Sequence, residues 1–423
     1  MITFNSNGNL PAMAWCSEFK DSQLNIYFGT GVQVYQSGVF EGGWSNTDTP
    51  EQLDESGLFA GSGIFLQGGN VFAISPTHTC EAIYIIKTKS STITSNSLAL
   101  ALSFSSVNNF KLSNVGGLIW TTTQGLNSYQ RLVYRDESIS IHRFVCCIVN
   151  TNSLLEIPHH PDYSFTSFKN YRSFLKRSIL DIRETSRLHS YTCFLSKGYD
   201  SVACASLMKS LGGGLTMSIE SSRSGIDDSG SEIAIALGLK NAVFTPKKRN
   251  QELINGERIY TYSLNDIDAS KFCLGYGLED ECLEVETDLI SGSVVLTGFH
   301  GDKIWDINTL PSKDIKRGDS SGSSLGEYRL RSGFVHIPVP MIGSLKHDEL
   351  YEMSNSSAMK AWSIGGNYDR PIARRLAEEQ GVPRESFGIR KSAVSSCHSP
   401  LSDILKNTFF ESNIKFYTNI LQE

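Results

Sequence analysis

The stretch from residue 191 to residue 211 constrains the fold of this chain more than any other. Residues 191–195 form a short apolar run that predicts a strand, residues 196–199 predict a tight turn, and an amphipathic helix is expected over 200–211. A strand that passes directly into a helix points backbone N–H groups and the positive end of the helix dipole at one place, which suits a phosphate group. Gly198 lets the backbone come close to such a group, and Asp200 could hold a Mg²⁺ ion that bridges phosphates.

The turn has the sequence Ser-Lys-Gly-Tyr-Asp-Ser over residues 196–201. It resembles the pyrophosphate loop (PP-loop) of the ATP pyrophosphatase superfamily, whose usual form is Ser-Gly-Gly-x-Asp-Ser. The departure is the lysine in a glycine position, where it could either add charge to the phosphate site or crowd it. The resemblance implies a set of residues that bind the phosphates of ATP, with the aspartate also as a Mg²⁺ ligand: Ser196, Lys197, Gly198, Asp200 and Ser201.

A second resemblance lies in residues 215–220 and 227–238. They are similar to the second strand and the following helix of asparagine synthetases, a branch of the same superfamily. In that family the end of the strand contacts adenine through backbone groups, which implies this role for Met217, Ser218 and Ile219. The alternative is an ordinary strand–helix unit with no ligand.

A third resemblance lies in residues 296–305, Leu-Thr-Gly-Phe-His-Gly-Asp-Lys-Ile-Trp. They look like the family's Ser-Gly-x-Gly-x-Asp-Glu turn. The matching positions are Thr297, Gly298 and Asp302, and the departing ones are His300 and Lys303. The resemblance implies that Gly298 lies at the nucleotide and that Asp302 is catalytic and shares Mg²⁺ with Asp200. A glycine-rich turn whose aspartate caps the next helix is the alternative.

A fourth resemblance lies near the end of the chain. Residues 381–391, Gly-Val-Pro-Arg-Glu-Ser-Phe-Gly-Ile-Arg-Lys, are similar to the Arg-Pro-Lys-x-Gly-Phe stretch of asparagine synthetases, which places a lysine by the phosphates. Lys391 is therefore the second catalytic candidate, since a lysine there can offset the charge of the departing pyrophosphate. A basic pair on the surface after a helix is the alternative.

The length of 423 residues and a change of sequence pattern after residue 160 predict two domains. Residues 1–160 are expected to form a β-rich domain of layered sheets, with β-branched and aromatic runs at 24–36 and 82–97 and a short helix at 97–103. Residues 161–423 open with a helix whose apolar residues recur between 165 and 182 and then alternate strands with helices. This alternation predicts an α/β domain, a parallel sheet with helices on both faces, of the PP-loop type.

Asparagine synthetases also carry an N-terminal glutaminase domain, whose nucleophile is a cysteine exposed when Met1 is removed. Residue 2 of this chain is Ile, so we expect no such nucleophile. Residues 83–99 are loosely like the final strands of that domain. The first domain is therefore interpreted as a possible degenerate relative, through which the chain could bind a partner protein or a second copy.

Composition narrows the classes of function. The net charge of −6 and the sequence pI near 5.9 make a broad nucleic-acid surface unlikely, since such a surface needs excess positive charge. The sequence contains no run near the roughly 20 apolar residues of a membrane helix, and its start does not resemble a signal peptide. The nine cysteines contain no Cys-x-x-Cys pair, which is typical of reduced core residues in a cytoplasmic protein.

Together the resemblances imply an ATP- and Mg²⁺-dependent synthetase. It would adenylate a carboxylate or carbonyl oxygen of a small-molecule acceptor and release pyrophosphate, after which ammonia or an amine would attack. A nucleotide-binding or regulatory protein without turnover is one alternative, favoured by Lys197, His300 and Lys303, which add positive charge. Another PP-loop enzyme that modifies a nucleobase or RNA is the other.

Three further features are open to two interpretations each. Arg329 and Arg331 alternate on an expected strand, so they should point the same way, toward either a substrate anion or an acidic residue. Residues 313–324 form a polar segment, either a disordered surface loop or a lid. Asp369 and Arg370 precede a helix with Pro371 in its first turn, where they could face the site.

Overall fold

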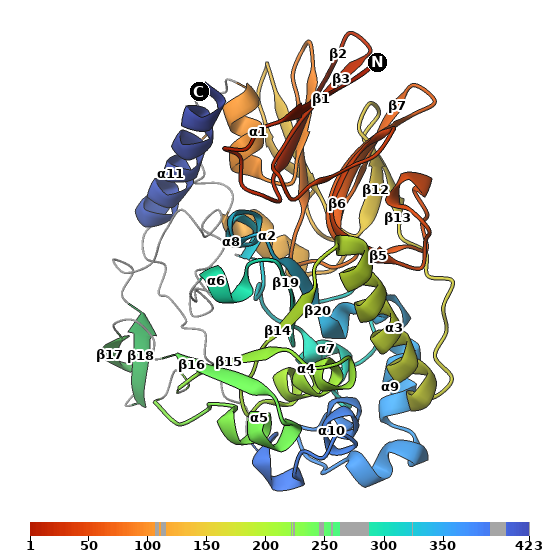
Figure 1. Cartoon of the computed structure of the whole chain (residues 1–423), viewed down its shortest axis with the longest axis vertical. Helices are drawn as coiled ribbons and strands as arrows, with labels where there is room; N and C mark the ends of the chain where they lie inside the picture. The colour runs from red at the N-terminus through yellow and green to blue at the C-terminus, as the bar shows by residue number, and fades with distance from the viewer. Residues whose placement is uncertain are drawn as a thin grey trace.

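The computed structural model describes residues 1–105, 110, 116–220, 222, 225–244, 249–254, 257–262, 287–323, 325–389 and 403–422. It is an α/β protein with two sheets in a β-rich N-terminal region and an all-parallel five-stranded sheet with helices in the C-terminal region. Figure 1 shows the N-terminal sheets at one end of the molecule and the parallel sheet toward the other.

The N-terminal region contains two sheets that share one core. The seven-stranded sheet has the order β1 (Ile2–Ser6), β3 (Gln23–Phe28), β2 (Trp15–Lys20), β9 (Thr92–Ser95), β8 (Ile83–Lys87), β11 (Ser140–Phe144), β10 (Leu132–Arg135). The six-stranded sheet has the order β13 (Leu155–Pro158), β12 (Cys147–Asn150), β7 (Asn70–Ile74), β6 (Leu58–Gln67), β5 (Gly38–Ser45), β4 (Gln33–Val34). Ile26 and Ile85 from the first sheet pack in one buried cluster with Ile64 and Val71 from the second, so the predicted layered β arrangement is confirmed.

The helices of this region are short. The expected helix near residues 97–103 is confirmed as α1 (Leu98–Ser105), whose leucines pack on Ile86 and Ile93 of the seven-stranded sheet. Helix α2 (Gly116–Thr123) follows it in the chain.

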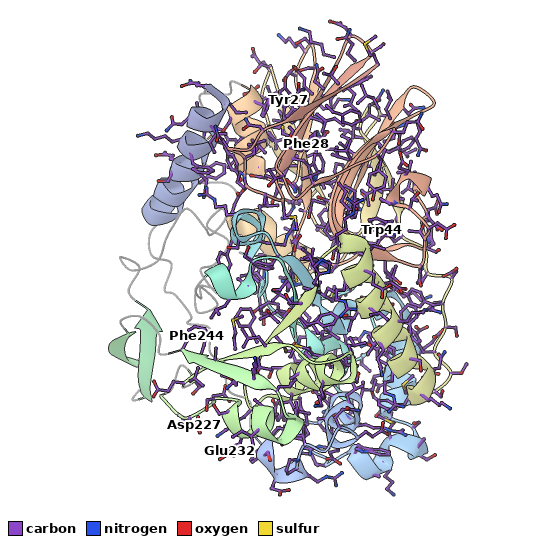
Figure 2. The ribbon with its side chains drawn as sticks, in the orientation of Figure 1. Tyr27, Phe28, Trp44, Asp227, Glu232 and Phe244 are labelled. Carbon is purple, nitrogen blue, oxygen red and sulfur yellow. The ribbon has the colours of Figure 1, made fainter. Side chains whose placement is uncertain are left out.

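Helix α3 (Phe168–Ser186) joins the two regions. Ser167 caps its N-terminus by accepting a hydrogen bond from Asn170 N–H at 3.3 Å, and its apolar positions recur at helical spacing. It lies against β5, where the N–H of Trp44, labelled in Figure 2, donates to Thr185 Oγ1 at 2.8 Å. The approach is close because residue 43 is glycine: a Cβ there would lie 2.0 Å from the carbonyl oxygen of Ile182.

The C-terminal sheet is parallel, as the sequence predicted. Its order is β16 (Lys240–Phe244), β15 (Leu215–Ile219), β14 (Ser190–Phe194), β19 (Ser293–Thr297), β20 (Val335–Pro338). After β14 the chain adds β15 and β16 on one side, and it then adds β19 and β20 on the other side of β14. In open α/β sheets, ligands bind at the carboxyl ends of the strands at such a reversal.

Each face of this sheet packs on different helices. The helices are α4 (Tyr199–Ser210), α5 (Ser231–Leu237), α6 (Thr287–Ile290), α7 (Gly301–Ile304) and α8 (Leu325–Ser332). Cys193 and Leu296 pack in one cluster with residues of α4 and α5. Met217 and Val295 point the other way, into a cluster with residues of α6 and α8.

Further strands and helices complete the described part of the C-terminal region, and the last helix packs on the N-terminal region. They are the paired strands β17 (Arg249–Ile254) and β18 (Glu257–Tyr262) and the helices α9 (His347–Ser354), α10 (Pro371–Glu378) and α11 (Asp403–Gln422). Helix α11 returns to α1, where Ser103 Oγ donates to the carbonyl oxygen of Ile414 at 3.1 Å (Figure 1). Among the described residues, no helix is long and apolar enough to cross a membrane.

The expected strand around Arg329 and Arg331 is wrong, because residues 325–332 form helix α8. Residues two apart on a helix point in different directions. Arg329 is buried, with Nη1 2.7 Å from Glu41 Oε2 and Nε 2.9 Å from Glu81 Oε2, whereas Arg331 donates to Asn413 Oδ1 at 2.6 Å. Of the two interpretations, the contact with acidic residues is therefore the one that holds for Arg329.

The segment 313–323 is anchored to the N-terminal region. Arg317 is buried and donates from Nη1 to Thr79 Oγ1 at 3.1 Å and from Nη2 to the carbonyl oxygen of Ser321 at 2.8 Å. Within these residues the interpretation as a disordered surface loop is wrong.

Candidate functional site

The turn after β14 is held by hydroxyl groups. Ser201 Oγ accepts the N–H of Ser196 at 3.1 Å and lies 3.0 Å from Ser196 Oγ, which in turn accepts the N–H of Gly198 at 3.2 Å. The first hydrogen bond within α4 runs from Val202 N–H to the Gly198 carbonyl at 3.2 Å, so the N–H groups of residues 199–201 precede it in the first turn. Both serines thus shape the turn at the N-terminus of α4.

Lys197 points to a neighbouring loop. Its Nζ lies 2.6 Å from Asp227 Oδ2, and its backbone N–H donates to Asp228 Oδ1 at 3.3 Å. Asp227 is labelled in Figure 2 near α5, and 64% of its side chain is exposed. In this arrangement the lysine neither crowds the turn nor places an unpaired charge in it.

The turn after β19 lies directly against Asp200. A Cβ at Gly298 would be 2.5 Å from Asp200 Cβ, and one at Gly301 would be 2.2 Å from Asp200 Oδ1. Only glycine permits this approach at both positions. The two segments that resemble family motifs, about 100 residues apart in the chain, are thus in contact at the reversal of strand order.

His300 lies where the resembling family turn usually has glycine. Its φ of +66° is in the left-handed region, which glycine adopts easily and histidine tolerates better than β-branched residues. The imidazole is buried and its Nε2 lies 3.0 Å from the Ser321 carbonyl oxygen. Burial, reinforced by Arg317, holds the pKa of His300 well below its usual value, so the ring is neutral and adds no positive charge to the site.

Arg370 occupies the open side of Asp200. The two form an ion pair through Arg370 Nη1 and Asp200 Oδ2, and their side chains are only 4% and 17% exposed. Asp200 Oδ1 is buried and has no hydrogen-bond partner within the described part of the chain. Burial, the largest cause, raises the pKa of Asp200 to about 6; Arg370 opposes this rise and Asp302 adds to it.

Aromatic rings support the arginines of α10. The Arg370 guanidinium lies 5.0 Å from the ring centre of Tyr368, and that of Arg374 lies 4.9 Å from the ring centre of Tyr199. Arg374 Nη2 also donates to the Tyr199 hydroxyl at 2.6 Å. The helix predicted after Pro371 is confirmed, and of the two residues before it Arg370 reaches the site. Asp369 instead accepts hydrogen bonds from the loop at 363–365.

Asp302 lies in the first turn of α7, partly exposed, and close enough to Asp200 and Arg370 to shift the pKa of both. The neighbouring Lys303 extends toward Gly318, where a Cβ would lie 2.5 Å from Lys303 Cε. The structure therefore brings the two predicted metal ligands within electrostatic reach of each other, and Arg370 is the counter-charge of Asp200.

The predicted adenine-binding residues are at the end of β15, next to β14. The Met217 carbonyl accepts the N–H of Leu195 at 2.8 Å, and Ser218 Oγ accepts the N–H of Gly230 at 3.2 Å. The Met217 carbonyl and the Ser218 hydroxyl are thus already hydrogen-bonded within the protein. Ile219, the last residue of the strand, is the one nearest the carboxyl edge.

Lys391 lies outside the described residues. The described segment just before it reaches the turn after β14, since Gly388 N–H donates to the Lys197 carbonyl at 2.9 Å. Ile389 follows with 74% of its surface exposed. The role expected for Lys391 stays a prediction.

A buried chain of polar groups connects the site to the N-terminal region. Thr297 Oγ1, at the end of β19, lies 2.7 Å from His336 Nε2, and His336 Nδ1 lies 3.5 Å from Glu81 Oε1. Glu81 and Glu41 then share the guanidinium of Arg329. Although burial favours a higher value, Arg329 and His336 lower the pKa of Glu81 to about 2. Sequence reasoning missed this chain, because its members are far apart and match no motif.

The residues present fit ATP with Mg²⁺ on one condition. The turn offers hydroxyl groups and the N-terminus of a helix, and Asp200 and Asp302 offer carboxylate oxygens, which Mg²⁺ prefers. Within the described ranges no group of three or more His, Cys, Asp and Glu side chains is arranged to hold a metal ion, so phosphate and water oxygens would complete the coordination. The condition is that Arg370 releases Asp200.

Comparisons with known proteins add no relative. A scan against protein-family models found no family that matches this chain, and a search of curated proteins found no match.

Proposed function

We propose that this protein is an ATP-dependent synthetase of the PP-loop type, related to asparagine synthetases. It adenylates a carboxylate or carbonyl oxygen of a small acceptor and transfers the activated group to ammonia or an amine. One observation carries the proposal. The turns after β14 and β19 meet where the strand order reverses, with Gly298 and Gly301 packed on Asp200.

The turn after β14 binds the phosphates. Ser196, Ser201 and the first-turn N–H groups of α4 donate hydrogen bonds to phosphate oxygens, and the helix dipole favours their charge. Asp200 and Asp302 would hold Mg²⁺, which would neutralise charge on the phosphates. The end of β15, around Ile219, borders adenine.

The reaction is an exchange of bonds at the α-phosphorus. The acceptor oxygen forms a bond to that phosphorus while the bond to the bridging oxygen breaks, so pyrophosphate leaves. The amine nitrogen then bonds to the activated carbon and loses one proton to water, and AMP leaves with the oxygen. The protein contributes position and electrostatic stabilisation, for which no covalent intermediate on the chain is required.

A second function, nucleotide binding without turnover, is favoured by a specific observation. Arg370 already neutralises Asp200, and the N–H groups of Ser196 and Lys197 are bound within the protein. Such a site can hold a nucleotide as a regulatory ligand without forming the arrangement that cleaves it.

The test measures pyrophosphate and AMP release from ATP and Mg²⁺ with pooled small carboxylates together with ammonia or amines. The synthetase predicts AMP formation that is lost in Asp200→Ala and Asp302→Ala but kept in Asp227→Ala, a matched exposed carboxylate nearby. ATP that protects against heat without AMP formation in any pool would support the regulatory protein. AMP that forms only when RNA is added would support the RNA-modifying alternative. If ATP neither protects nor reacts, the proposal is wrong.

A further inference from the structure

Arg370 occupies the place beside Asp200 that a divalent cation would need. Its Nη1 forms an ion pair with Asp200 Oδ2, and its Nε has no hydrogen-bond partner in the described part of the chain. The guanidinium and the carboxylate are both largely buried. This is a buried ion pair rather than a surface one.

Two glycines of the turn after β19 pack closely on Asp200. Gly301 lies behind Oδ1, where even a Cβ atom would come within 2.2 Å, and Gly298 lies behind the Cβ of the aspartate. The two glycines thus close part of the surroundings of this carboxylate, and Arg370 covers its Oδ2.

The charge around Arg370 is negative overall. Asp306 Oδ2 lies 3.8 Å from Arg370 Nε, and Asp302 is close enough to raise the pKa of Arg370. Arg370 thus contacts one carboxylate, lies near a second and is within electrostatic reach of a third. An excess of carboxylate attracts a divalent cation, so Arg370 and the cation compete for one place.

Aromatic rings beside Arg370 offer its guanidinium contacts away from Asp200. Its guanidinium lies over the ring of Tyr368 at 5.0 Å and 6.0 Å from the ring centre of Tyr199, so it can slide along an aromatic surface without losing contact. A Cβ at Gly198 would lie 3.9 Å from the Tyr368 hydroxyl, which places this surface beside the phosphate-binding turn. A guanidinium there can bind phosphate oxygens in a fork.

We propose that Arg370 is an exchange residue: it holds Asp200 in the empty site and moves to the phosphates when a divalent cation arrives with the nucleotide. The proposal rests on the proposed function, because it takes the ligand to be a metal–nucleotide complex. The consequence is cooperative binding. The cation alone must displace Arg370 with no compensation, whereas the complex supplies phosphate oxygens that accept the displaced guanidinium.

The test measures Mn²⁺ binding to the full chain at pH 8 by electron paramagnetic resonance, without nucleotide. Arg370→Gln should bind Mn²⁺ at least about tenfold more tightly than the parent, since an adjacent arginine shifts carboxylate equilibria by about 10- to 1,000-fold. Arg370→Lys, which keeps a charge but not the fork, should lie between them. Arg375→Gln, in the helix that follows Arg370 and paired with Glu379, should match the parent.

Nucleotide binding should change in the opposite direction. With saturating Mn²⁺, Arg370→Gln should bind a non-hydrolysable ATP analogue at least about tenfold more weakly, because a phosphate contact is lost. A purely structural ion pair would not produce opposite shifts for the metal and the nucleotide.

Two results would overturn the exchange. One is an equal affinity for Mn²⁺ in the parent and Arg370→Gln, or, if the latter does not fold, in the parent and Arg370→Lys. The other is undiminished Mn²⁺ binding in Asp200→Asn, which would place the ion elsewhere. Neither result depends on AMP release, so a failure of the exchange is distinguishable from a failure of the synthetase function.

Discussion

Replacing Gly298 by alanine tests the contact between the two turns. An ideal Cβ at this position lies 2.5 Å from Asp200 Cβ, 2.7 Å from the Asp200 carbonyl carbon and 2.9 Å from Ser201 N. Carbon atoms in ordinary contact are about 3.5–4.0 Å apart, so the first turn of α4 must retreat by about 1 Å. The obstructing atoms include backbone at a helix start, which cannot rotate away as the end of a long side chain can.

Overpacking of this kind costs about 1–3 kcal/mol in the free energy of unfolding. With roughly 2–4 °C for each kcal/mol in a domain of this size, the melting temperature should fall by about 2–12 °C. A displacement of about 1 Å should also lower AMP formation by about 100-fold, because the phosphate-binding turn no longer matches the metal ligands.

The assay is thermal unfolding with and without ATP and Mg²⁺, followed by AMP release. The matched control is Gly326→Ala in α8, where a Cβ would meet nothing within 4 Å. Alanine is the better helix former, so this variant should be more stable by about 0.5–1 kcal/mol. If Gly298→Ala is as stable as this control and ATP protects both equally, the two turns are not in contact and the site is not assembled as described.

Three further predictions concern charge. Arg329→Met leaves two buried carboxylates without their positive partner, so it should lower the free energy of unfolding, measured in urea, by about 3–5 kcal/mol. The more exposed Arg384→Met should lower it by about 1 kcal/mol or less. Equal effects of the two substitutions would contradict the buried network. Because the pKa of Asp200 rises from about 4 in the unfolded chain to about 6 in the folded one, the folded state binds more protons between these values. The stability of the parent relative to Asp200→Asn should therefore fall by up to about 3 kcal/mol from pH 4 to pH 6, and a flat difference would refute the assignment. Lys197→Ala should change the free energy of unfolding by less than about 1 kcal/mol, because its ion-pair partner Asp227 is exposed. If ATP no longer protects this variant against heat, Lys197 turns to the phosphates when ATP binds.

Local patterns determined much of the secondary structure. The strand at 191–195, the helix after it and the strand at 215–219 were predictable because apolar periodicity and glycine punctuation act within a few residues. The layered sheets of the N-terminal region were predictable from short runs of β-branched and aromatic residues, one of which contains β3. The helix at 325–332 was not predictable in this way, because Arg329 and Arg331 suit a strand face as well as a helix, and only burial of Arg329 against Glu41 and Glu81 decides between them.

In the candidate site, too, some features follow from the sequence and others only from the tertiary structure. The sequence alone determined which residues could carry phosphate and metal chemistry, because residue type and spacing in a turn set what the backbone and side chains can offer. Only the tertiary structure decided that Asp200 meets Gly298 and Gly301, that Lys197 turns to Asp227 and that Arg370 covers the carboxylate. These contacts join residues that are 30 to 170 positions apart. Their energy comes from burial and charge pairing between elements, which no local pattern records.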